Sequence, residues 1–536
     1  MKRLTLSFCC LIFLLGTGRL EAQIKTGQES SLSGRFYLQY QFYNINGSNG
    51  APSFQRRQNN LIRFRGYGTY KVNKDLSVPY KIMLQNHPFN FLTPRGVSEK
   101  TGIISFLTHP GNQLYFAPST KDYKLELGSI VPYYSSLSTG DVQIFGLGGS
   151  AQVSGLKIYA HTGMINRAFN RSTSNFNGNF FRSQISARVE KQVNDQHQLG
   201  VNLVRIRDWQ NSISDTTTEA IQNNIISVND RFRLSSKVSG EAELATGLSK
   251  GMAANFQLTF REKNWGVGVK TRWLGKDYII LAAPQLQSDR LDIIVSPNYR
   301  TLDNKWIVNG SIGLRSNNLS QLGDPTFTRQ ILASFNAMGQ LDDNWSINVS
   351  AANYGVRNQV ISDTLRIQMV SRSAILAPQY KINTGDVQHV IRPTFQLQAF
   401  TDFNALTSEL NDLTSTNIDL TYELILAKMS GGATVSFFNN STQFTPNQNI
   451  SFTLYGKGKF LQDRLAPFAY ITILNASGTS FPVGNKLLIR LGGKYTLDGK
   501  TQASLLLSNH NYRFGAAGMN PVTNEFRAQL SLYRQL

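Results

Sequence analysis

The sequence predicts an all-β fold, a single large antiparallel transmembrane β-barrel of about 22 to 26 strands with short periplasmic turns and long extracellular loops. Three observations lead to this prediction. Apolar and polar residues alternate along segments of about ten residues, short polar turns and long polar connections follow one another, and the last segment keeps the alternation to its end. A soluble β-sandwich or β-propeller also has alternating strands, but it has no reason to place short and long connections on opposite edges so regularly.

The first residues carry a different pattern. Two basic residues precede the apolar run from Leu4 to Leu15, and small residues follow up to Ala22. This order is typical of a secretory signal peptide, which is removed from the mature protein. We therefore assign residues 1–22 to a signal peptide and residues 23–536 to the outer-membrane barrel. Both cysteines of the chain lie inside the leader, so no disulfide is expected in the barrel.

The first predicted strands show the alternation most clearly. From Leu32 to Tyr43, and again from Ile62 to Val72, every second residue is mostly apolar and the residues between are mostly polar. Successive side chains of a strand point to opposite faces, so each segment has one apolar and one polar face. The apolar faces are expected to contact lipid, and the polar faces are expected to line the lumen.

The short turns share one chemical style. Asn, Asp and Gly recur in them, as at 73–75, 341–344 and 498–500, and these residues suit tight reversals because they tolerate the left-handed conformation or form local side-chain hydrogen bonds. Trp265, Trp306 and Trp345 each follow such a turn directly. Their common depth predicts an aromatic belt at the periplasmic interface of the membrane.

One segment departs from the strand pattern. Between Tyr123 and Phe169 lies a run of aromatic and hydroxyl residues that includes Tyr133, Tyr134 and Asp141, and a glycine-rich stretch follows it. This composition predicts a loop that folds inward, followed by a glycine-softened strand. Either this loop or the longer one from Phe89 to Gly111 is expected to constrict the lumen. The segment and the general layout of the chain resemble large, poorly characterised outer-membrane β-barrel proteins of the Bacteroidota type. That resemblance implies a porin-like barrel and carries no known activity.

The C-terminal segment predicts a final membrane strand. Phe526, Ala528, Leu530, Leu532 and Leu536 form one apolar face that reaches the last residue. This face resembles the C-terminal signal of bacterial outer-membrane proteins, although it ends in leucine instead of an aromatic residue. The resemblance implies assembly into the outer membrane.

Basic residues dominate the predicted polar faces, in a chain with a formal net charge of +21. A basic lumen favours anionic solutes. The alternative is that these side chains pair with acids on neighbouring strands or with lipopolysaccharide phosphates at the rim. Because the charges are dispersed along strands and no recognition module is present, no nucleic-acid partner is expected. The basic residues assigned to the lumen are Arg35, Arg63, Arg65, Lys71, Lys81, Arg182, Arg188 and Lys457.

No catalytic residue, metal site or cofactor is expected. The sequence around Ser508 and His510 comes nearest to a hydrolase cluster, but no second motif supports it, and no histidine pair has metal-ligand spacing. The sequence therefore predicts a non-enzymatic, porin-like passive channel in the cell outer membrane, in contact with lipid and lipopolysaccharide. The alternative is a structural or translocation component of a multi-protein outer-membrane complex that binds surface lipoproteins or other envelope partners.

Overall fold

The structure is a computed structural model. It describes residues 30–48, 60–86, 106–107, 111–140, 142–166, 180–213, 219–247, 251–279, 288–320, 327–358, 360, 366–404, 406–442, 447–478, 483–515 and 522–536. The predicted signal peptide, residues 1–22, and Asp141 of the predicted constriction loop lie outside the described residues.

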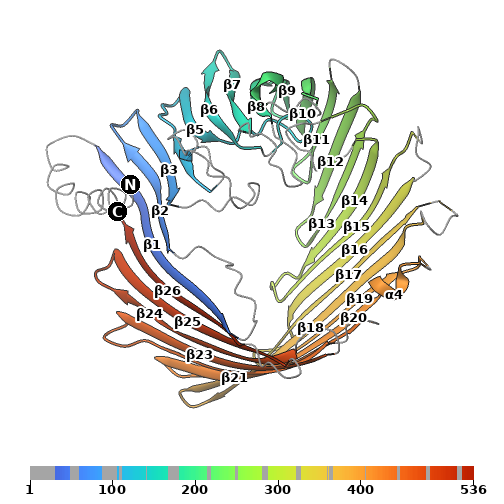
Figure 1. The fold of residues 1–536 in the computed structure, drawn as a ribbon. Coiled ribbons are helices and arrows are strands. Elements are labelled where there is room, and N and C mark those ends of the chain that lie inside the picture. Colours follow the sequence, from blue (N-terminus) through green and yellow to red (C-terminus); the bar gives the residue numbers. More distant parts are fainter. Residues whose placement is uncertain are drawn as a thin grey trace.

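Twenty-six strands form one sheet in which each strand is antiparallel to the next along the chain, and β1 pairs with β26 to close the ring (Figure 1). The first half of the ring contains β1 (Ser31–Ser48), β2 (Asn60–Lys71), β3 (Ser77–Gln85), β4 (Gln113–Phe116), β5 (Tyr123–Ile130), β6 (Ile144–Val153), β7 (Leu156–Asn166), β8 (Phe181–Gln192), β9 (His197–Trp209), β10 (Gln222–Arg233), β11 (Val238–Gly247), β12 (Met252–Arg261) and β13 (Trp265–Leu274). The second half contains β14 (Arg290–Arg300), β15 (Trp306–Asn317), β16 (Thr328–Gln340), β17 (Trp345–Asn358), β18 (Gln368–Thr384), β19 (Val387–Asp402), β20 (Leu413–Ile425), β21 (Met429–Thr442), β22 (Asn447–Gly458), β23 (Leu465–Gly478), β24 (Val483–Thr496), β25 (Thr501–Gly515) and β26 (Val522–Gln535).

The connections that the structure describes include the 3-10 turn η1 (Gln210–Ser212) and the short helix α4 (Ser408–Asn411). No helix within the described ranges is long and apolar enough to cross a membrane.

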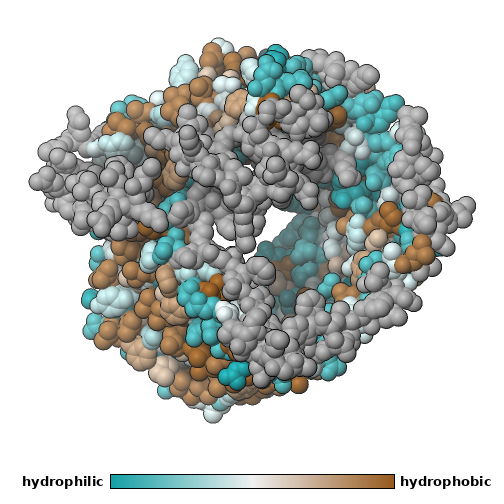
Figure 2. All heavy atoms as spheres, in the orientation of Figure 1, coloured by the Kyte–Doolittle hydropathy of each residue, from teal (hydrophilic) through white to brown (hydrophobic). Residues whose placement is uncertain are grey.

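Residues directly opposite each other on neighbouring strands lie on the same face of the sheet. The strand registers therefore show which residues of each successive strand belong to the inner face and which to the outer face. In β1, Gln39 and Gln41 are buried while Tyr40 is 42% exposed, so the polar residues point inward and the apolar ones outward. Figure 2 shows the same division, with hydrophobic residues over the outer wall and hydrophilic residues on the wall seen through the central opening. A closed sheet satisfies its backbone hydrogen bonds between strands, and the apolar outer face suits lipid. This is the architecture of a multi-pass outer-membrane β-barrel.

The short turns lie at the barrel end where β1 begins and β26 ends, since Ser31 pairs with Lys71 just before the first turn. Side-chain oxygens close them as expected. Asn73 Oδ1 accepts the backbone N–H of Leu76 at 2.7 Å, and Asp342 Oδ1 accepts that of Trp345 at 2.7 Å. In the last such turn, backbone N–H donors lower the pKa of Asp498. We call this end of the barrel the turn end, and the opposite end the loop end.

The prediction that short and long connections alternate strictly is only partly correct. At the loop end, β3 and β4 are joined by the long connection 86–112, whereas 248–251 and 443–446 are as short as turns. An antiparallel ladder requires only a reversal between strands, so either end accepts a tight connection. The predicted strand number of 22 to 26 is confirmed at its upper limit, because the stretch from Gln113 to Ile130, whose alternation is unclear in the sequence, contains both β4 and β5.

Candidate functional site

The connection between β5 and β6 folds onto the inner face of the barrel. Tyr134 is 2% exposed and Leu137 is fully buried. Both pack in one apolar cluster with Val204, Ile206 and Ile225, which belong to the inner faces of β9 and β10. A barrel wall that held only water would not be expected to carry apolar residues on its inner face. We call the inner faces of β8–β13 the loop-covered wall.

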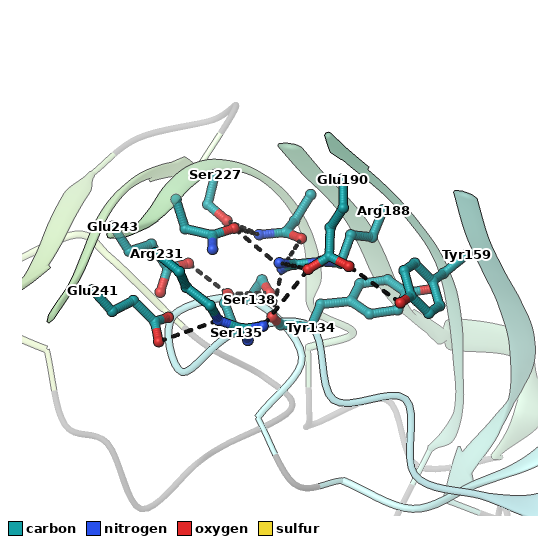
Figure 3. A network of polar contacts seen from close by, with 12 residues as sticks. Tyr134, Ser135, Ser138, Tyr159, Arg188, Glu190, Ser227, Arg231, Glu241 and Glu243 are labelled. Atoms are coloured by element: carbon teal, nitrogen blue, oxygen red, sulfur yellow. Dashed lines mark hydrogen bonds and ion pairs between the residues drawn. The ribbon is translucent and has the colours of Figure 1, made fainter. Parts of the chain in front are cut away.

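Arg188 is the centre of the polar contacts beneath this connection (Figure 3). Its Nη1 donates to the carbonyl oxygen of Tyr134 at 2.6 Å, to Asn202 Oδ1 at 2.8 Å and to Asn229 Oδ1 at 3.1 Å. Its Nη2 lies 2.5 Å from Glu190 Oε1. All of these side chains are buried. The guanidinium therefore ties the connection to three neighbouring strands.

A second anchor joins the connection to β11. Ser135 Oγ donates to Glu243 Oε1 at 2.5 Å and lies 2.5 Å from Ser138 Oγ. Ser135 and Glu243 are both nearly fully buried, so this carboxylate and hydroxyl pair is closed to solutes. Its arrangement fits an anchoring role.

Two tyrosines complete the attachment. The Tyr134 hydroxyl lies 2.7 Å from His161 Nδ1, and His161 Nε2 lies 2.9 Å from Glu126 Oε2. Burial raises the pKa of Tyr134 to about 12. From the β13–β14 connection, the Tyr278 hydroxyl donates to the carbonyl oxygen of Leu137 at 2.5 Å, and burial raises the pKa of Tyr278 too.

The other residues of the predicted constriction loop are placed differently. Tyr133 is 52% exposed, next to the buried Tyr134. The inward position of the connection agrees with the expectation from sequence, and its narrowing of the lumen stays a prediction.

Three of the predicted lumen residues form ion pairs on the inner face. Arg182 Nε and Nη2 donate to the two carboxylate oxygens of Asp208 at 2.7 and 2.9 Å. Arg188 pairs with Glu190, and Lys457 Nζ lies 3.3 Å from Glu423 Oε1. Arg182 thus pairs with an acid on the neighbouring strand, as the alternative expected, whereas Glu190 lies on the same strand as Arg188 and Glu423 lies two strands away from Lys457.

The remaining five lie together on β1–β3. The registers place Arg63 opposite Gln39 of β1 and Gln85 of β3, and the same face continues through the cross-strand pairs around it. Arg63 Nη2 donates to Gln85 Oε1 at 3.2 Å, and the other four side chains are exposed. Within the described strands β1–β3, this inner face carries no Asp or Glu. Its five basic residues are Arg35, Arg63, Arg65, Lys71 and Lys81.

Three further basic residues on β24 were missed by the sequence reading. Lys486, Arg490 and Lys494 are four residues apart, so they share one face, and the registers continue that face through β25 and β26 into β1. The spacing was a usable signal, but Leu487, Leu488 and Ile489 make the segment apolar on both faces and hid it. We call the inner faces of β24–β26 and β1–β3 the basic wall. Among its described residues the acid is Glu525, which is buried near the loop end of β26.

The loop-covered wall and the basic wall differ in their ion pairs. The ion pairs that the described residues form lie on β5–β15 and β19–β22 or in their turns, and the named basic residues of β24 and β1–β3 take part in none of them. At the turn end, a cavity of about 370 Å³ next to the basic wall is lined by Lys457, Phe468, Tyr470 and Lys494 among others. Cationic and aromatic side chains there face the same space.

The three predicted belt residues begin β13, β15 and β17 at the turn end, on the outer face. The ring centre of Trp265 lies 4.9 Å from that of Phe260, and the ring centre of Trp345 lies 4.4 Å from that of Tyr380. Trp306 lies against Gly339. Their shared depth is the arrangement that an interface belt requires, and contact with the interface itself stays a prediction.

The hydrolase-like residues lie on the inner face of β25. Ser508 is buried opposite Arg527 of β26, and His510 Nδ1 lies 3.2 Å from the Tyr512 hydroxyl. In the part of the chain that the structure describes, no group of three or more His, Cys, Asp or Glu residues could hold a metal ion.

No family model matches the chain, and no curated protein matches it. Solved structures that resemble it include OccK11 (OpdR) of Pseudomonas aeruginosa, with 11% identity over 94% of this chain and 96% of that chain and a TM-score of 0.32. OccK2 (OpdF) of the same organism has 9% identity over 95% and 98% of the two chains, with a TM-score of 0.32. Outer-membrane expressed OmpT of Vibrio cholerae has 10% identity over 64% and 99%, with a TM-score of 0.25. At these values the similarities identify neither family nor function, and the Bacteroidota type stays a prediction.

Proposed function

We propose that the barrel is a porin-like channel for passive diffusion across the outer membrane and that its lumen favours anionic solutes. The observation that carries this proposal is the basic wall, where Arg35, Arg65 and Lys81 are exposed and take part in no ion pair among the described residues. Charges of one sign along a low-dielectric wall concentrate counter-ions beside it.

The position of the β5–β6 connection supports the same function. It packs against β8–β13, and in a closed ring of 26 strands β25 lies half the ring away from β12. The anchors described above lie outside the basic wall, and we expect the connection to narrow the lumen. Figure 2 shows an opening in the middle of the barrel.

The test is ion selectivity in planar bilayers. Purified barrel is inserted into a neutral phospholipid bilayer, and the reversal potential is measured across a potassium chloride gradient. We expect anion preference that weakens in Arg65→Glu and weakens further in the Arg63→Glu/Arg65→Glu pair. The effect should be larger at about 0.01 M salt, where the Debye length is about 30 Å, than at about 1 M, where it is about 3 Å.

The matched control is Lys191→Glu. Lys191 is exposed on the outer face of β8 near the turn end, because it pairs with Leu199, which is 42% exposed. The control changes the total charge as Arg65→Glu does but leaves the inner face untouched. An equal change in both single variants would contradict a local role for the basic wall. A silent bilayer would contradict the channel and favour the alternative of a component in a multi-protein outer-membrane complex.

A further inference from the structure

Arginines face outward at the loop end of β16–β18. Arg329 of β16 lies directly opposite Arg357 of β17, and Arg357 lies opposite Gln368 of β18. Arg329 shares its face with Ile331 and Phe335, which are 54% and 44% exposed, so this is the outer face. Both arginines are exposed. Side chains directly opposite each other in such a register have Cβ atoms about 5 Å apart.

Two like charges at this separation repel each other and destabilise the strand pair unless an anion lies between them. Among the described residues of β16–β18, the outer face carries no Asp or Glu, and no ion pair includes Arg329 or Arg357. Arg372, also exposed on this face, lies deeper along β18. The described residues of β16–β18 thus present a cluster of cations on the outer face without an acid on that face.

The cluster lies at the depth of the second membrane interface. Trp345 begins β17 at the turn end, and Arg357 is twelve residues further along the same strand. At about 3.4 Å per residue and a tilt of about 45°, this separation corresponds to about 30 Å of height. That value matches the hydrocarbon thickness of a bilayer, so Trp345 and Arg357 fit opposite interfaces.

Aromatic rings hold two of the outer arginines at this end. The guanidinium of Arg329 lies 5.0 Å from the ring centre of Phe327, and that of Arg207 of β9 lies 4.8 Å from the ring centre of Trp209. A guanidinium over a ring keeps the N–H groups at its edge available. Those planar donors match phosphate oxygens in a bidentate geometry.

We propose that Arg329 and Arg357, with Arg372 below them, form a docking site for the phosphates of the lipopolysaccharide glycolipid in the outer leaflet. Arg329 and Arg357 together carry more positive charge than one phosphodiester can neutralise. A headgroup with two phosphates carries enough negative charge to neutralise both arginines. The site lies on the outside of the barrel and is separate from the channel function.

The test measures lipid binding to the whole barrel in detergent by native mass spectrometry. The probe is lipid A with two phosphates. We expect the Arg329→Gln/Arg357→Gln pair to weaken binding about ten-fold, because hydrogen bonds to charged groups are the strong ones. Arg329→Lys/Arg357→Lys should weaken it less, about three-fold, because lysine keeps the charge but loses the planar fork. Lys191→Gln, at the other end of the outer face, should bind as wild type does.

Three results would overturn the proposal: unchanged binding in the glutamine pair, equal loss in Lys191→Gln, or equal binding of dephosphorylated lipid A. Equal retention of phosphatidylglycerol would overturn the assignment to the glycolipid. Folding of each variant is checked by heat-modifiable migration on a gel. Should the glutamine pair fail to fold, unchanged binding in the lysine pair overturns the proposal and weakened binding supports it.

Discussion

At the scale of single residues, Arg188 and Arg65 have identical chemistry and different surroundings. Arg188 is 3% exposed and donates to Tyr134, Asn202 and Asn229, whereas Arg65 is exposed on the basic wall. Both follow the same alternation in the sequence. The difference arises because a connection from more than fifty positions earlier covers Arg188, and a local pattern contains no information about that contact.

Arg188→Met should therefore destabilise the barrel. The substitution removes the nearest cation from the buried Glu190 carboxylate, which keeps the Tyr159 hydroxyl as a donor, and it removes the guanidinium donor from Asn202 Oδ1. Removing one partner of a buried ion pair costs about 3 to 5 kcal/mol. The free energy of unfolding is measured by urea titration of the refolded protein. Arg490→Met is the control, because Arg490 is exposed, and its effect should stay within about 0.5 kcal/mol. A similar loss in both variants would contradict the anchoring role of Arg188.

At the scale of elements, the sequence identified the strands and the turns well because both depend on neighbouring residues. It also identified the segment around Tyr133 and Tyr134 as unusual. It could not say which wall that segment contacts, because the apolar inner residues Val204, Ile206 and Ile225 look like ordinary strand residues in the sequence. The basic residues of β24 were missed for a related reason, since apolar neighbours surround them.

Leu137→Asp tests whether the β5–β6 connection narrows the lumen. Leu137 is fully buried in the apolar cluster, and an unpaired carboxylate there costs several kcal/mol, so the connection should detach from the loop-covered wall. The strand ladder is untouched, and we expect a larger single-channel conductance. Tyr133→Asp, at an exposed position of the same connection, is the control and should conduct as wild type does. Unchanged conductance in Leu137→Asp would exclude a constriction by this segment.

At the scale of the whole molecule, each described strand pairs with the next one along the chain, and among these strand pairings only that of β1 with β26 joins distant parts of the sequence. This explains why the barrel class could be predicted from local alternation alone. The strand number could only be bounded, because β4 is a single short strand without a clear alternation.

Closure predicts a sharp requirement for the last strand. Deleting residues 522–536 exposes the edges of β1 and β25, and open edges are not tolerated in the hydrocarbon region. We expect no heat-modifiable, membrane-inserted form on a gel. Leu530→Val, which changes the outer face of β26 but keeps its pairing, is the control and should insert normally. Insertion of the truncated chain would show that β1 and β25 can close the ring without β26.

The unequal distribution of ion pairs also has a mechanical consequence. Around β5–β15, ion pairs and the β5–β6 connection brace the inner surface across several strands. The described contacts between neighbouring strands of β24–β26 and β1–β3 include hydrogen bonds such as Arg63 to Gln85, and the named basic residues there form none of the ion pairs. A ring that is stiff along one arc and compliant along the other deforms by bending its compliant arc. Thermal fluctuations of the barrel cross-section should therefore move the basic wall relative to the braced arc of β5–β15. The width of the lumen and the electrostatic field of the basic residues should then change together.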